Sequence, residues 1–214
     1  MAKRMKKQTP AEIRKVLRAA AKDDQVVKVH FDEMEGSRRA YVIEVSKDLL
    51  LYVELDLNSM EYEGPNVARL SSVLGVSVDE AKVQKFYALG PMLLGHEKPT
   101  VPKIRLTSMA AVLTDFKEHY LCIWIEAPSE VRGACWIGNF WSVNRTTLQL
   151  FEINPDGRWK DDWSYFPIRA ITHVKVNNGY VNALWLVANH LGKLEAEASD
   201  AVAEASPKKA RKSH

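Results

Sequence analysis

Two tryptophans among basic residues form the most chemically suggestive feature of the sequence. Trp159 and Trp163 lie in the polar stretch DGRWKDDWSY at 156–165, where Arg158 and Lys160 flank Trp159. Flat aromatic side chains beside cations stack on nucleic-acid bases, and they also anchor protein interfaces. We expect a hairpin tip here, which either exposes these side chains or folds them onto its own domain. These four residues are candidate contacts to a protein partner or to nucleic acid.

The other tryptophans fit a core better than a binding site. Trp124 and Trp141 lie at positions that fit the alternation of a strand, and Trp185 belongs to an apolar run with Tyr180 and Leu184. Large aromatic side chains commonly fill small cores. We therefore expect Trp124, Trp141 and Trp185 to be buried.

Metal, cofactor and catalytic chemistry lack their usual residues. The six histidines are spread singly, with no HExxH pair and no CxxC, and no phosphate-binding or nucleophile motif occurs. The carboxylates of Asp156, Asp161 and Asp162 do not have the alternate spacing of a calcium loop. Cys122 and Cys135 are expected to be small core residues without a disulfide. We interpret the chain as a non-enzyme without metal or cofactor, unless a site forms in a cleft between domains.

The elements that position these residues appear twice, offset by about 98 residues. Helical apolar patterns follow Thr9, which begins a capping box with Glu12, and Thr107, which caps without one. Alternating strand patterns come next, with apolar residues in the same phase in both copies. The matching apolar pairs include Val42/Phe140, Val45/Val143, Leu50/Leu148, Leu55/Ile153, Leu70/Ile168, Val76/Val174 and Val78/Val176. We infer a duplicated unit.

This pattern predicts a mainly β fold with short helices, of the α+β class. Each copy is expected to be a small closed barrel preceded by an N-terminal helix. The boundary falls in GHEKPTVPKIRL, which contains two prolines and several charges. The expected segments are a basic tail at 1–8, barrels at 9–94 and 107–192, a linker at 95–106 and a disordered tail at 193–214. The front half of that tail, at 193–205, could instead form a frayed helix.

Charge is concentrated at the two ends of the chain. Residues 1–8 and 206–214 each carry +4, so removing both from the overall +3 leaves −5 for residues 9–205. An acidic body weakens the case for a broad phosphate-binding surface, although the tails could attract nucleic acid. No apolar run reaches the ~18 residues that span a bilayer, and no signal-peptide pattern follows the N-terminus. We expect a cytoplasmic protein without membrane contact.

A helix followed by five short strands resembles the Sm and LSm family of small β-barrels, and the tandem plan is similar to that of uncharacterised bacterial proteins. Loops that carry RNA-binding residues in the Sm family correspond to Ser46–Asp48 and Asn144–Thr146. The resemblance makes Asp48 and Asn144 candidate contacts, and the basic Lys47 and Arg145 beside them are further candidates. It also implies an Arg-Gly pair near strand five, but Arg169 is followed by Ala170, which departs from the pattern for RNA binding.

The leading hypothesis is a non-enzymatic binding or assembly module that self-associates, or binds a protein partner, through strand edges and loop tips. Strand edges favour this, because unpaired backbone groups can pair with another chain. The matching tip of the first copy, NSMEYEG at 58–64, is acidic, whereas the tip of the second copy carries both acidic and basic residues. This difference suits a contact between the acidic tip and basic groups of a neighbouring copy. The alternative is binding of RNA or another nucleic acid through the basic tails and barrel loops.

Overall fold

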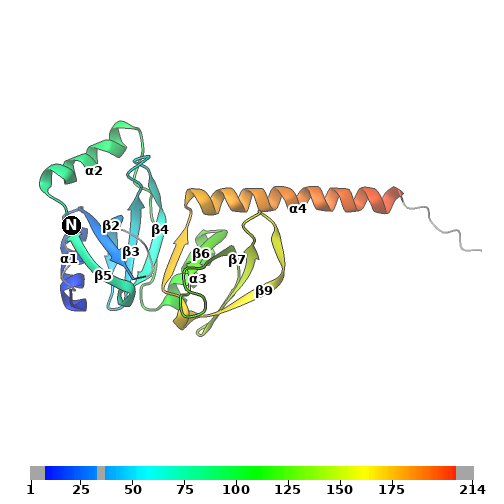
Figure 1. Cartoon of the computed structure of the whole chain (residues 1–214), viewed down its shortest axis with the longest axis horizontal. Helices are drawn as coiled ribbons and strands as arrows, with labels where there is room; N and C mark the ends of the chain where they lie inside the picture. The colour runs from blue at the N-terminus through cyan, green and yellow to red at the C-terminus, as the bar shows by residue number, and fades with distance from the viewer. Residues whose placement is uncertain (1–7, 33–36, 206–214) are drawn as a thin grey trace, which may run out of the picture.

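The computed structural model describes residues 8–32 and 37–205, and the two halves share one order of elements: a helix, five strands and a second helix (Figure 1). A short 3-10 helix precedes the fifth strand of each half. The first half contains α1 (Pro10–Lys22), β1 (Val26–Phe31), β2 (Arg38–Val45), β3 (Leu49–Leu55), β4 (Tyr62–Arg69), η1 (Leu70–Ser72), β5 (Val73–Val78) and α2 (Ala81–Leu93). The second half contains α3 (Met109–His119), β6 (Cys122–Glu126), β7 (Cys135–Val143), β8 (Thr147–Ile153), β9 (Trp159–Pro167), η2 (Ile168–Ala170), β10 (His173–Val176) and α4 (Gly179–Ala205).

The first helix of each half begins at a side-chain cap. The Thr9 hydroxyl accepts a hydrogen bond from the Glu12 backbone N–H, and the Glu12 carboxylate accepts one from the Thr9 N–H, which completes the predicted capping box. In α3 the cap is Ser108, one residue later than the expected Thr107, and its hydroxyl accepts from the Ala111 N–H. Each cap satisfies a backbone donor that the first helical turn leaves free.

Strand pairing repeats between the halves in the register that the sequence offset predicts. Val42 pairs with Tyr52 and Phe140 with Leu150, and both hairpins have a bulge immediately afterwards, before Glu44 and Ser142 respectively. The fifth strand returns to the first in both halves, so that Val29 pairs with Val76 and Ile125 with Val174. The shared register shows that the two halves follow the same pairing plan.

The strands form one open, ten-stranded antiparallel sheet instead of the two separate closed sheets that we expected. Its order is β5-β1-β2-β3-β4-β10-β6-β7-β8-β9, so that, among the described residues, strands of the two halves pair with each other only where β4 meets β10. An exposed β4 edge would leave backbone donors and acceptors unpaired, and β10 satisfies them. Arg69 strengthens this junction through hydrogen bonds from its side chain to the carbonyls of Ile168 and Ile171.

Apolar packing also crosses the junction. Leu49, Leu51 and Val67 of the first half belong to the core that α3 and the strands of the second half form. A separate core packs α1 against the opposite face of the first half, where Leu17 and Leu50 are fully buried. The shared core explains why the linker at 95–106 does not separate two independent bodies: Ile104 and Leu106 within it are buried.

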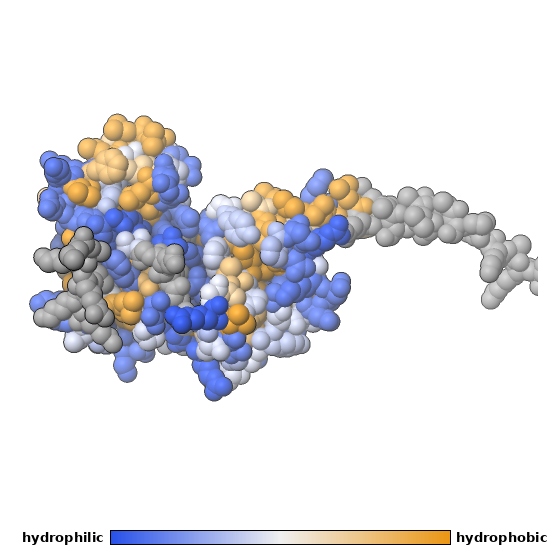
Figure 2. Space-filling view, viewed as in Figure 1, coloured by the Kyte–Doolittle hydropathy of each residue, from blue (hydrophilic) through white to orange (hydrophobic). Residues whose placement is uncertain are grey.

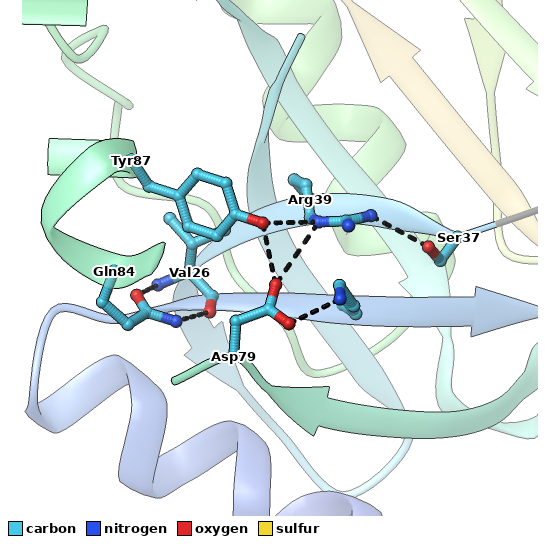
Figure 3. A network of polar contacts seen from close by, with 7 residues as sticks. Val26, Ser37, Arg39, Asp79, Gln84 and Tyr87 are labelled. Carbon is cyan, nitrogen blue, oxygen red and sulfur yellow. Dashed lines mark hydrogen bonds and ion pairs between the residues drawn. The ribbon is translucent and has the colours of Figure 1, made fainter. Parts of the chain in front are cut away.

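A polar network fixes α2 to the strands of the first half (Figure 3). The Tyr87 hydroxyl donates to Asp79 at 2.7 Å and accepts from Arg39 at 3.0 Å, while Lys28 lies 2.5 Å from the same carboxylate. Burial acts to raise the pKa of Asp79, but the hydrogen bonds from Lys28 and Tyr87 lower it. Because a charged Asp79 is stabilised here, we interpret the network as a structural attachment of the helix.

The outer face of α2 is apolar. Phe86, Leu89, Met92 and Leu93 are 48–76% exposed, and apolar residues gather over this helix in Figure 2. The network on the opposite face of α2 keeps these side chains directed outward. Clusters of exposed apolar side chains are typical of interaction surfaces.

Helix α4 begins on the second half and then leaves it (Figure 1). Val181, Leu184 and Ala188 pack on Ile137 and Ile153 of the sheet. The helix continues to Ala205, so residues 193–205 are helical, which agrees with the alternative of a helix in the front half of the expected disordered tail. The basic ends at 1–7 and 206–214 lie outside the described residues. No helix in the described part of the chain is both long and apolar enough to cross a membrane.

Candidate functional site

The candidate site is built on β9, the terminal strand of the sheet on the second half. The hairpin that leads into it turns at 154–158, where the Gly157 N–H donates to the Asn154 carbonyl and Gly157 has a φ of 81°. Only glycine adopts that backbone region without strain. The turn is tighter than the expected tip at 156–165, so Trp159 and Trp163 lie on the strand itself.

Four aromatic rings form a continuous row, the aromatic ladder, across β7, β8 and β9. The ring centroids of Trp141 and Trp163 are 4.1 Å apart, and those of Trp163 and Phe151 are 4.7 Å apart. Phe151 then stacks on Trp159 at 5.0 Å with an interplanar angle of 8°. Phe151 and Trp163 are directly opposed across β8 and β9, which is the arrangement that brings cross-strand aromatics together.

The two ends of the aromatic ladder differ in exposure. Trp159 packs under α4 against the core that contains Val181 and Ala188. At the other end, Trp141 is 56% exposed, although the sequence analysis expects it in the core. The bulge between Phe140 and Ser142 accounts for the difference, because the extra residue in a bulge shifts the facing of side chains. Trp124 and Trp185, which were also expected to be buried, are partly buried against the α4 core.

Tyr165 extends the exposed aromatic surface along β9. It is 64% exposed, and its hydroxyl accepts a hydrogen bond from the Gln149 side chain at 3.0 Å. The opposite side of β9 has no strand paired with it among the described residues. Exposed rings therefore lie beside an edge whose backbone groups can pair with an added strand.

Charges around the aromatic ladder are mixed and largely neutralised. Lys160 forms an ion pair with the buried carboxylate of Glu152, and the Arg158 Nε atom lies 3.9 Å from Asp156. Asp161 and Asp162 are exposed on the same strand. The local field is thus not positive, which disfavours a polyphosphate backbone at this position.

The other four predicted contacts do not join this site. Lys47 and Asp48 lie in the β2–β3 loop of the first half, where their carbonyls accept hydrogen bonds from Arg14 and Leu70. The Asn144 side chain accepts from the N–H groups of Thr146 and Thr147, so it shapes the β7–β8 turn. Arg145 is exposed in that turn, at the end of β8 opposite the 154–158 turn.

Only Arg158, Trp159, Lys160 and Trp163 are therefore brought together, and all four lie on or beside β9. Sequence reasoning missed Phe151, Trp141 and Tyr165 as members of the surface. The alternation of Gln149 and Phe151 against the buried Leu148 and Leu150 was the signal that could have placed Phe151 on the outer face.

The cysteines and metal ligands provide no competing site among the described residues. Cys122 is buried, but Cys135 is exposed, contrary to the expected core position, and neither forms a disulfide. Cys135 begins β7 at its outer end, opposite Glu126, where the core no longer covers the strand. No group of three or more His, Cys, Asp or Glu side chains in the described residues could hold a metal ion.

Comparisons with known proteins do not assign the chain to a family. No family model matches it, and no curated protein matches it. Among solved structures, the apo form of MrkH from K. pneumonia is similar over 94% of this chain and 99% of that one, with 8% identity and a TM-score of 0.18. At that TM-score the similarity carries no argument about fold or function.

Proposed function

We propose that the protein is a non-enzymatic binding and assembly module, built from two tandem Sm-like units, that binds protein through the β9 edge and the aromatic ladder. The repeated pairing plan supports the tandem units. The observation that carries the binding function is the aromatic ladder, with Trp141 exposed at one end and the exposed Tyr165 beside it, next to an unpaired edge strand. An added strand would gain backbone hydrogen bonds from β9 and side-chain contacts from the rings.

The chemistry of the surface indicates the kind of segment that fits. Trp141 and Tyr165 offer exposed ring faces, and Asp161 and Asp162 add negative charge on the same strand. An extended apolar segment would bury the exposed rings, and its backbone would pair with the β9 edge. Nucleic acid also stacks on aromatic rows, but here the adjacent carboxylates would repel its phosphates.

The test is selection of short peptides from a displayed random library on the full-length protein, followed by affinity measurement. We expect selected peptides to protect the β9 amides from hydrogen exchange and to lose at least about tenfold in affinity against Trp141→Ala, since a central aromatic contact contributes about 2 kcal/mol. Tyr180→Ala is the matched control, because Tyr180 is 54% exposed on α4, away from the aromatic ladder.

Two outcomes would count against this function. Peptides that protect other elements while Trp141→Ala binds them normally would remove the role of the aromatic ladder. Binding of single-stranded RNA that survives deletion of residues 1–8 and 206–214, yet is lost in Trp141→Ala, would show that the surface serves nucleic acid instead.

A further inference from the structure

We propose that the segment recognised by the β9 edge is the β5 edge of a second copy, and that the Gln8 side chain occupies this β5 edge until the second copy displaces it. The inference rests on the proposed binding function of β9 and names its partner. Strands β5 and β9 are the two ends of the same sheet. They are also the repeat equivalents of β10 and β4, which already pair with each other inside the chain.

The internal junction supplies the register of the proposed contact. There, His173 pairs with Ala68, Val174 with Val67 and Lys175 with Asn66. The equivalents of these residues in the other repeat lie 98 positions earlier for β10 and 98 positions later for β4. The proposed contact therefore pairs Gly75 with Phe166, Val76 with Tyr165, and Ser77 with Ser164 of the second copy. The segment Ser164–Phe166 of β9 carries no charge, whereas Asp161 and Asp162 lie outside it. The paired segment is therefore free of the charges that commonly protect edge strands.

The outward backbone groups of β5 are already bound as a neighbouring strand would bind them. The Val76 N–H donates to Oε1 of Gln8 at 2.6 Å, and Nε2 of Gln8 donates to the Val76 carbonyl at 3.0 Å. A side-chain amide has one acceptor and donors in the same plane, so it reproduces the pairing of one peptide group. At the equivalent position Val174 is paired with Val67 of β4. Gln8 thus takes the place of a single residue of an added strand.

A groove beside this edge leaves space for the incoming strand. It has a volume of about 710 Å³ and lies between α1 and β5, with Val16, Ala19 and Val78 among its lining residues and Gln8 at its margin. Val78 is 41% exposed there. An added strand would cover these apolar groups as it replaces Gln8.

Two substitutions between the repeats make the external contact weaker than the internal one. Pro167 is the repeat equivalent of Arg69, whose side chain donates to two carbonyls at the internal junction. Proline has no side-chain donor, so the external contact lacks those two hydrogen bonds. Asp162 stands at the position of Gly64, where a Cβ would overlap the carbonyls of Val176 and Asn177. The contact is therefore reversible and limited to three residue pairs, and because it is head-to-tail it extends to rings or chains.

The first experiment measures self-association of the full-length protein by sedimentation velocity over a range of concentrations. Gln8→Ala removes the amide that must leave, so we expect association about tenfold tighter than wild type, which corresponds to about 1.4 kcal/mol. Gln84→Ala is the matched control: the Gln84 amide pairs both backbone groups of Val26 in the same manner, outside the proposed contact. Equal association in wild type and Gln8→Ala would overturn the role of Gln8.

The second experiment tests the register directly. In a Cys135→Ser background, Ser77→Cys with Ser164→Cys should give disulfide-linked oligomers under mild oxidation, because these residues face each other in the proposed pairing. Ser77→Cys with Asp161→Cys is out of register and should not cross-link. Asp162→Gly should tighten association further by relieving the overlap. Absence of in-register cross-links in folded protein, as judged by circular dichroism, would overturn the self-pairing.

The two proposals can fail separately. Peptides that bind β9 and depend on Trp141, in a protein that shows no in-register cross-link, would leave the binding function standing and reject the second copy as partner. Cross-links in register together with tighter association of Gln8→Ala would support the inference.

Discussion

The hydroxyl of Tyr52 lies 2.5 Å from Nε2 of His173, and this contact joins β3 of the first half to β10 of the second. Both side chains are almost completely buried, at 0% and 2% exposure. The Phe31 ring packs on the His173 ring with centroids 4.8 Å apart. The halves are thus held by a buried side-chain contact in addition to the backbone pairs of β4 and β10.

Tyr52→Phe should destabilise the protein by about 1–3 kcal/mol, because it leaves a buried ring nitrogen of His173 without a hydrogen-bond partner. Urea unfolding of the purified variant would measure the loss. Tyr180→Phe is the matched control, since Tyr180 is 54% exposed and the same change should alter stability little. A Tyr52→Phe protein as stable as wild type would mean that the contact does not hold the halves together.

Stability should also fall as pH drops below about 6.5. Burial lowers the pKa of His173, and the charges of Lys175 and Arg38 lower it further. Between the lowered folded value and the ordinary unfolded value of about 6.5, the unfolded chain binds a proton that the folded chain does not. The free energy of unfolding therefore decreases with falling pH, by at most about 1.4 kcal/mol per unit from this residue.

The measurement is the free energy of unfolding at several pH values for wild type and His173→Gln. The carboxylates titrate in both proteins, so the difference between the two curves isolates His173. The pH range should be 4 to 7, about three units that include the ordinary histidine pKa. If the free energies of unfolding of the two proteins change in parallel over this range, His173 does not titrate as inferred.

The duplicated plan of the fold could be predicted from the sequence because side-chain alternation fixes strand register. The apolar pairs such as Val42/Phe140 and Val76/Val174 occupy equivalent ladder positions in the structure. A slip of one residue would expose every buried side chain of a strand, so the pattern leaves little freedom. The shared pattern does not, however, indicate whether two repeats close separately or join.

The join and much of the site could not be predicted, because they depend on contacts between distant segments. Residues Asn66–Ala68 pair with β3 of their own half, and nothing in their sequence indicates that the other edge of β4 pairs with His173–Lys175. Trp141 has the strand phase of a core residue, and only the bulge places it outside. For Arg158, Trp159, Lys160 and Trp163, their closeness in the sequence was enough to place them on or beside one strand.

Gly64→Ala should weaken the junction between the halves. A Cβ on Gly64 would overlap the backbone carbonyls of Val176 and Asn177, which cannot move without displacing β10. Overpacking of this kind costs about 1–3 kcal/mol, and we expect a loss of stability in that range. Gly179→Ala is the control, because no atom lies within 4 Å of its added Cβ. Thermal unfolding that shifts equally in both variants would contradict the close approach.

Tyr87→Phe should loosen α2 with little effect on the remainder of the fold. The variant removes the hydroxyl that donates to Asp79 and accepts from Arg39, a loss of about 1–3 kcal/mol if Asp79 is left without a replacement donor. Hydrogen exchange should therefore accelerate in Ala81–Leu93, and exchange in β7 and β8 should not change. Uniform acceleration across the chain would instead indicate that α2 unfolds only with the whole protein.

Trp163→Ala should interrupt the aromatic ladder at its centre, because Trp163 is the ring that contacts both Trp141 and Phe151. Each aromatic pair contributes about 0.5–1.5 kcal/mol beyond its buried area, so removal of two pairs should lower stability by about 1–3 kcal/mol. The exciton coupling between Trp141 and Trp163 in circular dichroism should disappear. Tyr165→Ala, on the same face but outside the stacked rings, should keep that coupling. If Trp163→Ala retains the coupling, the rings do not stack in solution, and the rigid surface from which we infer protein binding is absent.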